Sequence, residues 1–140
     1  MKIFQLHTGD DELHIRAVRL LNDFEMPLER SRELLAEPTY VFLVAIDSFG
    51  DIMGRIYGHV LHRYGQTDLL LYEVDVAEQH QRKGVGKAMM ENIRTFCTEH
   101  HYNEMWVLTE EDNIPARALY RNTGGRLEAS PTMMYVFDTI

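Results

Sequence analysis

The sequence feature that most constrains the fold is a glycine-containing turn, residues 81–88, between a strand-like run and an amphipathic helix. Residues 69–76, which precede the turn, are rich in apolar and β-branched side chains, as strands are. Beyond it, apolar residues recur at spacings of four, four and three, which predicts one buried helix face: Val85, Met89, Ile93 and Phe96. A buried strand that runs directly into a helix is typical of mixed α/β proteins.

The turn has the features of an anion-binding site. Gly84 and Gly86 have no Cβ, so the main chain can bend sharply there and approach a ligand closely. The first amides of the following helix lack intrahelical acceptors, and the helix dipole is positive at that end. Arg82, Lys83 and Lys87 add positive charge. We therefore predict that the turn binds a pyrophosphate, with a plain strand-to-helix turn as the alternative on these residues alone.

Two better-known phosphate-binding loops do not fit this turn. The Rossmann fingerprint requires a third glycine where this chain has Met89. A Walker A loop requires Ser or Thr directly after its lysine, whereas Ala88 follows Lys87.

Length and composition indicate one globular domain over residues 1–140, large enough to bury a core without disulfides or metal. No signal-peptide pattern or membrane-spanning apolar run is present, so a cytoplasmic location without membrane association is the default expectation. The single cysteine, Cys97, falls in the predicted helix and is expected to be a core residue. The seven histidines show no metal-ligand spacing, so no metal is predicted.

The net charge of −8, from 22 acidic and 14 basic residues, argues against nonspecific nucleic-acid binding, which requires phosphate neutralisation by Lys and Arg. The acidic excess favours cationic partners through long-range attraction. The alternative is that it only keeps the protein soluble.

The pattern along the chain predicts an α/β fold with a mixed, mostly antiparallel central sheet flanked by helices. From residue 40, three strands joined by tight turns are followed by a helix, a strand, a second helix and a last strand. Strands are predicted over residues 2–7, 40–46, 52–63, 69–76, 105–109 and 133–137. Helices are predicted over 27–35, 84–100 and 115–123, and a first helix has a predicted apolar face of Leu13, Ala17, Leu20, Leu21 and Phe24.

A second motif follows the turn by about 30 residues: Asn113-Ile114-Pro115-Ala116-Arg117-Ala118-Leu119-Tyr120, or Asn-x-x-Ala-x-x-Leu-Tyr. The turn itself reads Gln81-Arg82-Lys83-Gly84-Val85-Gly86. In this order, each at the start of a helix after a strand, the two motifs resemble the GNAT N-acyltransferases from about residue 40 onward. The resemblance implies that acetyl-CoA is a co-substrate and that its acetyl group passes directly to an amine, without a covalent enzyme intermediate.

The resemblance also implies roles for individual residues. Tyr120 would protonate the departing CoA thiolate, and backbone amides near Val76 and Ala77 would polarise the thioester carbonyl. The predicted cofactor-binding residues are Val74, Val76, Gln81, Arg82, Lys83, Gly84, Val85, Gly86, Lys87, Asn113, Ala116 and Tyr120.

Glu73 and Asp75 alternate on one predicted strand and should therefore face the same side. Such a pair can hold an ammonium group and accept its proton, directly or through water, and two close carboxylates make each other better bases. Residues 72–76, 78–82 and 115–120 resemble the aminoglycoside 3-N-acetyltransferase branch more closely, which implies a small polycationic acceptor. That branch has paired acids where this chain has Asn113 and Ile114, and the upstream run of Glu110, Glu111 and Asp112 is the predicted replacement.

Two other functions remain open from the sequence. One is acetylation of a protein lysine or N-terminal amine, and the other is a non-catalytic module that binds acetyl-CoA. The resemblance also implies that a homodimer is possible, since dimers are common in the family, but one sequence leaves the oligomeric state open.

Overall fold

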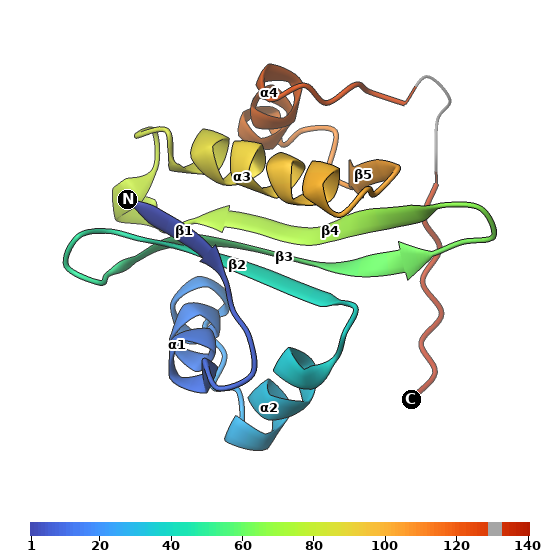
Figure 1. Ribbon diagram of the computed structural model, residues 1–140. Helices are drawn as coiled ribbons and strands as arrows, with labels where there is room; N and C mark the ends of the chain where they lie inside the picture. Colours follow the sequence, from blue (N-terminus) through green and yellow to red (C-terminus); the bar gives the residue numbers. More distant parts are fainter. Residues whose placement is uncertain (129–132) are drawn as a thin grey trace.

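In the computed structural model, which describes residues 1–128 and 133–140, a five-stranded sheet lies between two layers of helices (Figure 1). The strand order is β1-β2-β3-β4-β5; the first four strands are antiparallel neighbours, and β5 is parallel to β4. The predicted fold class is confirmed. The strands are β1 Lys2–Gln5, β2 Tyr40–Ile46, β3 Ile52–His62, β4 Thr67–Val76 and β5 Glu104–Val107.

The helices divide between the two faces of the sheet (Figure 1). On one face lie α1 (Asp11–Asn22) and α2 (Leu28–Ala36), and on the other lie α3 (Val85–Glu99) and α4 (Ile114–Asn122). Each face has its own apolar core. The α3 core contains Leu43, Ile56, Leu69, Leu71, Met89 and Ile93, and the α1 core contains Leu6, Ala17, Phe42 and Val44.

A β-bulge in β4 determines which side chains reach which face. Tyr57 and Gly58 of β3 pair with Glu73 and Leu71, so Tyr72 has no partner opposite it. The extra residue shifts the alternation of side chains along the strand. Before the bulge, the odd-numbered side chains of Leu69 and Leu71 lie in the α3 core. After it, the even-numbered side chains of Val74 and Val76 pack against that core. The bulge thus directs Tyr72 and Glu73 to the other face.

Strands β4 and β5 separate partway along their length. Their parallel pairing ends at Leu71 and Val107, whereas β4 continues to Val76. Beyond this point the chain of β4 turns through a short 3-10 helix, Glu78–His80, into α3. The separation opens one edge of β4 near the start of α3, where Gly86 lies against Val76 of β4 and Leu119 of α4.

Two sequence predictions about buried elements are wrong. Leu20 of α1 is 49% exposed, and Phe24, which lies beyond the end of the helix, is 56% exposed, whereas His14 is buried with Ala17. His14 replaces an apolar residue there because both ring nitrogens have partners: Nδ1 lies 2.8 Å from Ser31 Oγ and Nε2 lies 2.8 Å from Tyr40 Oη.

The predicted strand over residues 133–137 is also absent. These residues have no neighbouring strand in the described chain and are exposed to solvent, and a strand requires a hydrogen-bonding partner. Across the described residues, no helix has both the length and the apolar character needed to cross a membrane.

Candidate active site

The predicted pyrophosphate turn has the expected backbone geometry. Helix α3 begins at Val85, directly after Gly84, whose φ of 82° lies in the left-handed region. The Ala88 amide donates to the Gly84 carbonyl at 3.0 Å, and no side chain caps the helix. The amides of residues 85–87 are therefore oriented outward at the positive end of a 15-residue helix, which suits an anion.

The side chains of the turn divide into two groups. Arg82, Lys83 and Lys87 are exposed and form no ion pair with any described residue, so they can contact phosphate oxygens. Gln81 instead donates from Nε2 to the Val76 carbonyl at 3.1 Å. It fixes the turn to the end of β4.

The two glycines of the turn have different functions. A Cβ on Gly84 would meet no atom within 4 Å, so only the left-handed backbone requires glycine there. A Cβ on Gly86 would lie 3.3 Å from Leu119 Cδ2 and 3.6 Å from Val76 Cγ2. Gly86 therefore allows α3 to pack closely against α4 and β4, a structural role that the motif alone does not reveal.

Glu73 and Asp75 lie on one side of β4, as predicted, and both bind the same arginine. Arg55 of β3 is fully buried; its Nη2 donates to Glu73 Oε2 at 2.7 Å and its Nη1 to Asp75 Oδ2 at 2.9 Å. Asn22, at the end of α1, accepts from Arg55 Nη2 at 2.6 Å and donates to Glu73 Oε2 at 3.0 Å. We call Asn22, Arg55, Glu73 and Asp75 the carboxylate cluster.

Arg55 corrects the charge expected at this site. The sequence suggested two unopposed carboxylates, but the guanidinium between them leaves the cluster with a net charge of −1. The Glu73 and Asp75 side chains remain 25% and 49% exposed, so solvent or an acceptor can reach them. Arg55 Nε is buried without a hydrogen-bond partner among the described residues. Both Arg55 and Asn22 were missed by sequence reasoning.

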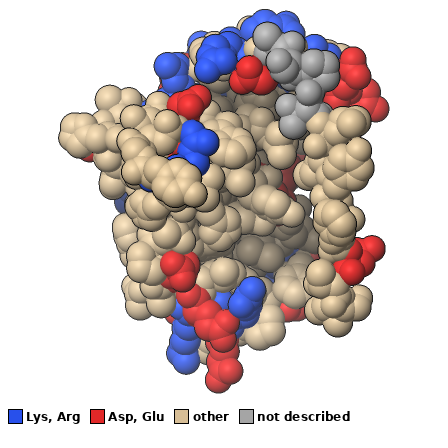
Figure 2. All heavy atoms as spheres, turned by 90° about the vertical axis from the view of Figure 1, so that its right-hand side faces the viewer, with Lys and Arg blue, Asp and Glu red and all other residues tan. Residues whose placement is uncertain are grey.

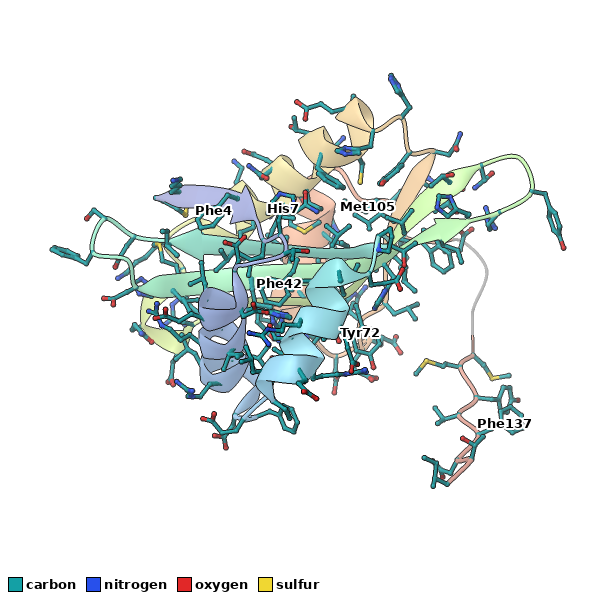
Figure 3. The ribbon with its side chains drawn as sticks, turned by 60° about the horizontal axis from the view of Figure 1, so that its bottom comes forward. Phe4, His7, Phe42, Tyr72, Met105 and Phe137 are labelled. Atoms are coloured by element: carbon teal, nitrogen blue, oxygen red, sulfur yellow. The ribbon has the colours of Figure 1, made fainter. Side chains whose placement is uncertain are left out.

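Aromatic rings extend from the carboxylate cluster across the same face. The rings of Tyr57 and Tyr72 are 5.4 Å apart, and those of Tyr40 and Tyr57 are 5.9 Å apart. Tyr72 is 67% exposed. Figure 3 is turned toward this face and labels Tyr72 and Phe42. Burial, and secondarily the charge of Glu73, raises the pKa of Tyr57, so its hydroxyl stays protonated. Ring faces beside carboxylates suit an organic cation.

Tyr120 lies on α4, partly buried against the α3 core. Burial raises the pKa of its phenol, and the negative charge of Asp75 raises it further. A phenol that stays protonated at neutral pH can act as a proton donor. Helix α4 begins with a cap in which Asn113 Oδ1 accepts from the Ala116 amide at 3.2 Å.

The acidic run is not joined to the carboxylate cluster. Glu110, Glu111 and Asp112 are exposed in the segment between β5 and α4. Within the described residues, no hydrogen bond or ion pair links their carboxylates to Glu73 or Asp75. A role for the run in acceptor binding stays a prediction.

Two further expectations concern chemistry at the site. The Ala77 amide donates to the Met53 carbonyl at 2.8 Å, so it is not free to polarise a thioester, which corrects the prediction for that residue. Cys97 is buried in the α3 core, as predicted, and burial raises the pKa of its thiol to about 11. It is therefore unsuited to act as a nucleophile. No group of three or more His, Cys, Asp or Glu side chains in residues 1–128 and 133–140 is arranged to hold a metal ion.

Comparisons with known proteins agree with this geometry. The model of the acetyltransferase (GNAT) family matches residues 5–124. A mycothiol acetyltransferase from Pseudarthrobacter chlorophenolicus is 32% identical over 85 residues, which are 59% of this chain and 26% of the relative. A streptothricin acetyltransferase from Streptomyces lavendulae is 28% identical over 81 residues, 58% of this chain and 42% of the relative. The chain thus matches less than half the length of either curated relative.

A solved structure covers almost all of the chain. It is an aminoglycoside acetyltransferase from an uncultured soil metagenomic sample, in complex with trehalose. The sequence identity is 25% and the TM-score is 0.88, over 99% of this chain and 96% of that one.

Proposed function

Because the chain belongs to the GNAT family of N-acetyltransferases, we propose that it transfers the acetyl group of acetyl-CoA to a primary amine of a small cationic acceptor such as an aminoglycoside. The observation that carries the proposal is the carboxylate cluster. Two carboxylates, fixed by a buried arginine, are accessible on the sheet face beside exposed aromatic rings. This arrangement can bind an ammonium group and accept its proton.

The cofactor fits the opening beside β4. The outward amides of residues 85–87 and the basic side chains of Arg82, Lys83 and Lys87 would hold the pyrophosphate of acetyl-CoA. The edge of β4 at Val74 and Val76 has no β5 beside it, so a pantetheine arm can run along it in the place of a strand.

In the proposed reaction, the acceptor ammonium first binds Glu73 and Asp75 and gives one proton to a carboxylate, directly or through water. The neutral amine then attacks the thioester carbonyl, the new C–N bond forms, and the C–S bond breaks. Tyr120 gives its phenolic proton to the departing thiolate, and the second proton that the nitrogen loses as the amide forms returns to the Tyr120 phenolate, directly or through water. The raised pKa of Tyr120 keeps the phenolic proton available at neutral pH.

The charge of the site bears on the acceptor. A cluster of net charge −1 neutralises one ammonium group. Further ammonium groups of a polycation would contact other acidic side chains, and the net charge of −8 would attract the whole molecule. An aminoglycoside acetyltransferase among the structural neighbours supports an acceptor of this class. Acetylation of the 3-amino position, implied by the resemblance in residues 72–76, is the finer part of the proposal.

A protein amine is the second candidate, and one observation favours it. Glu73 and Asp75 do not line the hollow of about 290 Å³ that lies among α3, α4 and β5. They are on a face where Tyr72 is 67% exposed, and an accessible face can also receive a peptide.

The test is an acetyl-CoA-dependent assay with aminoglycosides, polyamines, peptides and neutral amines. Glu73→Gln should raise the KM for a polycation and leave the KM for acetyl-CoA nearly unchanged. The matched control is Glu91→Gln, at an exposed position of α3 on the other face of the sheet. Added salt should weaken the acceptor interaction, because the Debye length is about 10 Å at 0.1 M. Faster, salt-insensitive turnover of peptides or neutral amines would contradict the small-cation acceptor, and binding of acetyl-CoA without any turnover would indicate a non-catalytic module.

A further inference from the structure

The β-bulge places two consecutive residues, Tyr72 and Glu73, on the same face of the sheet. In a regular strand, consecutive side chains point to opposite faces. Here Glu73 pairs with Tyr57 in the ladder, and the unpaired Tyr72 has its ring 5.4 Å from the ring of Tyr57. Figure 3 shows Tyr72 on the face that carries α1 and α2, where Asn22 of α1 donates to Glu73. An aromatic ring and a carboxylate of the cluster are therefore neighbours on one accessible surface.

Packing does not account for the ring of Tyr72. It is 67% exposed and belongs to neither apolar core of the described residues. Tyr57, in contrast, packs against the α1 core, and the centre of the Arg55 guanidinium lies 5.7 Å from the Tyr57 ring. Tyr57 is therefore held in place by the protein and supports one side of Tyr72. Most of the remaining surface of Tyr72 faces solvent.

The position of the ring restricts the kind of amine that can use it. The Cα atoms of consecutive residues are about 3.8 Å apart. An acceptor whose ammonium group binds Glu73 can therefore contact Tyr72 only with carbon atoms that lie close to the nitrogen. An amine attached directly to a saturated six-membered ring meets this condition, because several C–H groups on one side of the ring are held next to the nitrogen.

Charge and rigidity both favour such a ring over an open chain. The C–H groups near an ammonium carry partial positive charge, and the face of an aromatic ring is negative. A saturated ring presents these groups in a fixed arrangement, whereas a linear amine must lose rotations about its bonds to lie against Tyr72. The carboxylate cluster, with its net charge of −1, matches the single ammonium group nearest the ring.

We propose that Tyr72, supported by Tyr57, determines acceptor specificity by binding the saturated ring that carries the amino group, as in an aminocyclitol or an amino sugar. This role rests on the acceptor site proposed above, because Glu73 must bind the ammonium group. It also names the acceptor class: amines on a ring are preferred to amines on a flexible chain, such as linear polyamines and lysine side chains. The contact requires the aromatic ring of Tyr72 and not its hydroxyl.

The first experiment compares cyclohexylamine with n-hexylamine, which have the same number of carbon atoms and one ammonium group each, in the acetyl-CoA-dependent assay. The wild type should have the higher kcat/KM for cyclohexylamine. Tyr72→Ala should reduce the ratio of the two kcat/KM values about fivefold, the size expected for one lost ring contact. Tyr72→Phe should keep most of the ratio, because it retains the aromatic ring.

The matched control is Tyr64→Ala. Tyr64 is fully exposed in the β3–β4 turn, which lies at the end of the sheet that faces the viewer in Figure 2. The last residues of β4 and the start of α3 lie at the opposite end of the sheet (Figure 1). Tyr64→Ala should therefore leave the ratio of the two kcat/KM values unchanged.

The second experiment measures binding without turnover. Ligand-observed NMR titrations of the CoA-bound protein give the Kd of each amine. The wild type should bind cyclohexylamine more tightly than n-hexylamine, and Tyr72→Ala should lose that difference. Equal affinities in the wild type, tighter binding of n-hexylamine, or a preference that survives in Tyr72→Ala would overturn the role of Tyr72, even if acetyl transfer is observed. A Tyr72-dependent preference in binding, without acetylation of either amine, would support that role and contradict only the proposed acetyl transfer.

Discussion

Replacing Arg55 by methionine tests whether the carboxylate cluster is assembled as described. Methionine keeps much of the apolar stem but removes the guanidinium that joins Glu73, Asp75 and Asn22. The two carboxylates are then left close together without a cation. The substitution should therefore destabilise the fold and disturb the acceptor site together.

The expected size follows from burial. Breaking a fully buried ion pair typically costs about 3–5 kcal/mol, because one charge is left without a partner. Arg55 is fully buried, but the Glu73 and Asp75 side chains are 25% and 49% exposed, so water can replace part of what they lose. We therefore expect Arg55→Met to lower the free energy of unfolding by about 2–4 kcal/mol.

Urea unfolding followed by circular dichroism at neutral pH measures this loss. The matched control is Arg30→Met, which breaks an ion pair with Glu33 in which both side chains are more than 60% exposed; it should cost less than about 1 kcal/mol. Adding Glu73→Gln should reduce the cost of Arg55→Met, since one unpaired charge is removed. The reasoning is refuted if Arg55→Met lowers the free energy of unfolding no more than Arg30→Met does. It is also refuted if the losses from Arg55→Met and Glu73→Gln simply add, because Arg55 then does not interact with Glu73.

Three other predictions address the cofactor turn, the acid and the buried histidine. Gly84→Val should raise the Kd for acetyl-CoA at least about tenfold, because the left-handed φ of 82° is strained for valine and the side chain borders the outward amides. Gly86→Val should also destabilise the fold, because its side chain would meet Leu119. An unchanged calorimetric affinity of Gly84→Val for acetyl-CoA would refute the turn as the cofactor site. Tyr120→Phe should lower kcat on the order of 10²- to 10⁴-fold with little change in acetyl-CoA binding, whereas a near-normal kcat would leave Tyr120 a packing residue. For His14, burial, only partly opposed by the charge of Asp11, lowers the pKa from 6.5 to about 4, so between these values the unfolded chain binds a proton that the folded chain does not. The free energy of unfolding should be highest above pH 6.5 and should fall by up to about 3 kcal/mol as the pH drops toward 4. In urea unfolding, His14→Gln should lose this part of the pH dependence. The same change of unfolding free energy with pH in both proteins would contradict the prediction.

Local sequence patterns predicted the elements that depend on local physics. The strand Tyr40–Ile46 has the predicted bounds, and α3, Val85–Glu99, differs from its prediction by one residue at each end. Strand β4 begins at Thr67, not Leu69, because Thr67 and Asp68 also pair with β3, although aspartate is more typical of turns than of strands. The failed strand over residues 133–137 has a suitable composition, but composition does not supply a pairing partner.

The candidate site was predictable only in part. Glu73 and Asp75 could be assigned to one side because alternation on a strand is local. Arg55 and Asn22 could not, because they reach Glu73 from 18 and 51 residues away along the chain. One signal was nevertheless present: Arg55 is a lone charge between Gly54 and Ile56 in a predicted strand, and such a charge needs a partner when buried.

The bulge at Tyr72 also bears on how a site of this kind can change during evolution. One extra residue separates the two halves of β4. The upstream half contributes Leu69 and Leu71 to the α3 core, and the downstream half carries the carboxylates of Glu73 and Asp75 on the opposite face. Losing that one residue would leave a regular ladder in which Gly58 pairs with Leu71 and Tyr57 with Glu73, so Glu73 and Asp75 would keep their face and only the ring of Tyr72 would be lost. Point substitutions on this face, and even loss of the extra residue itself, can therefore alter the choice of acceptor gradually without turning the two carboxylates into the core.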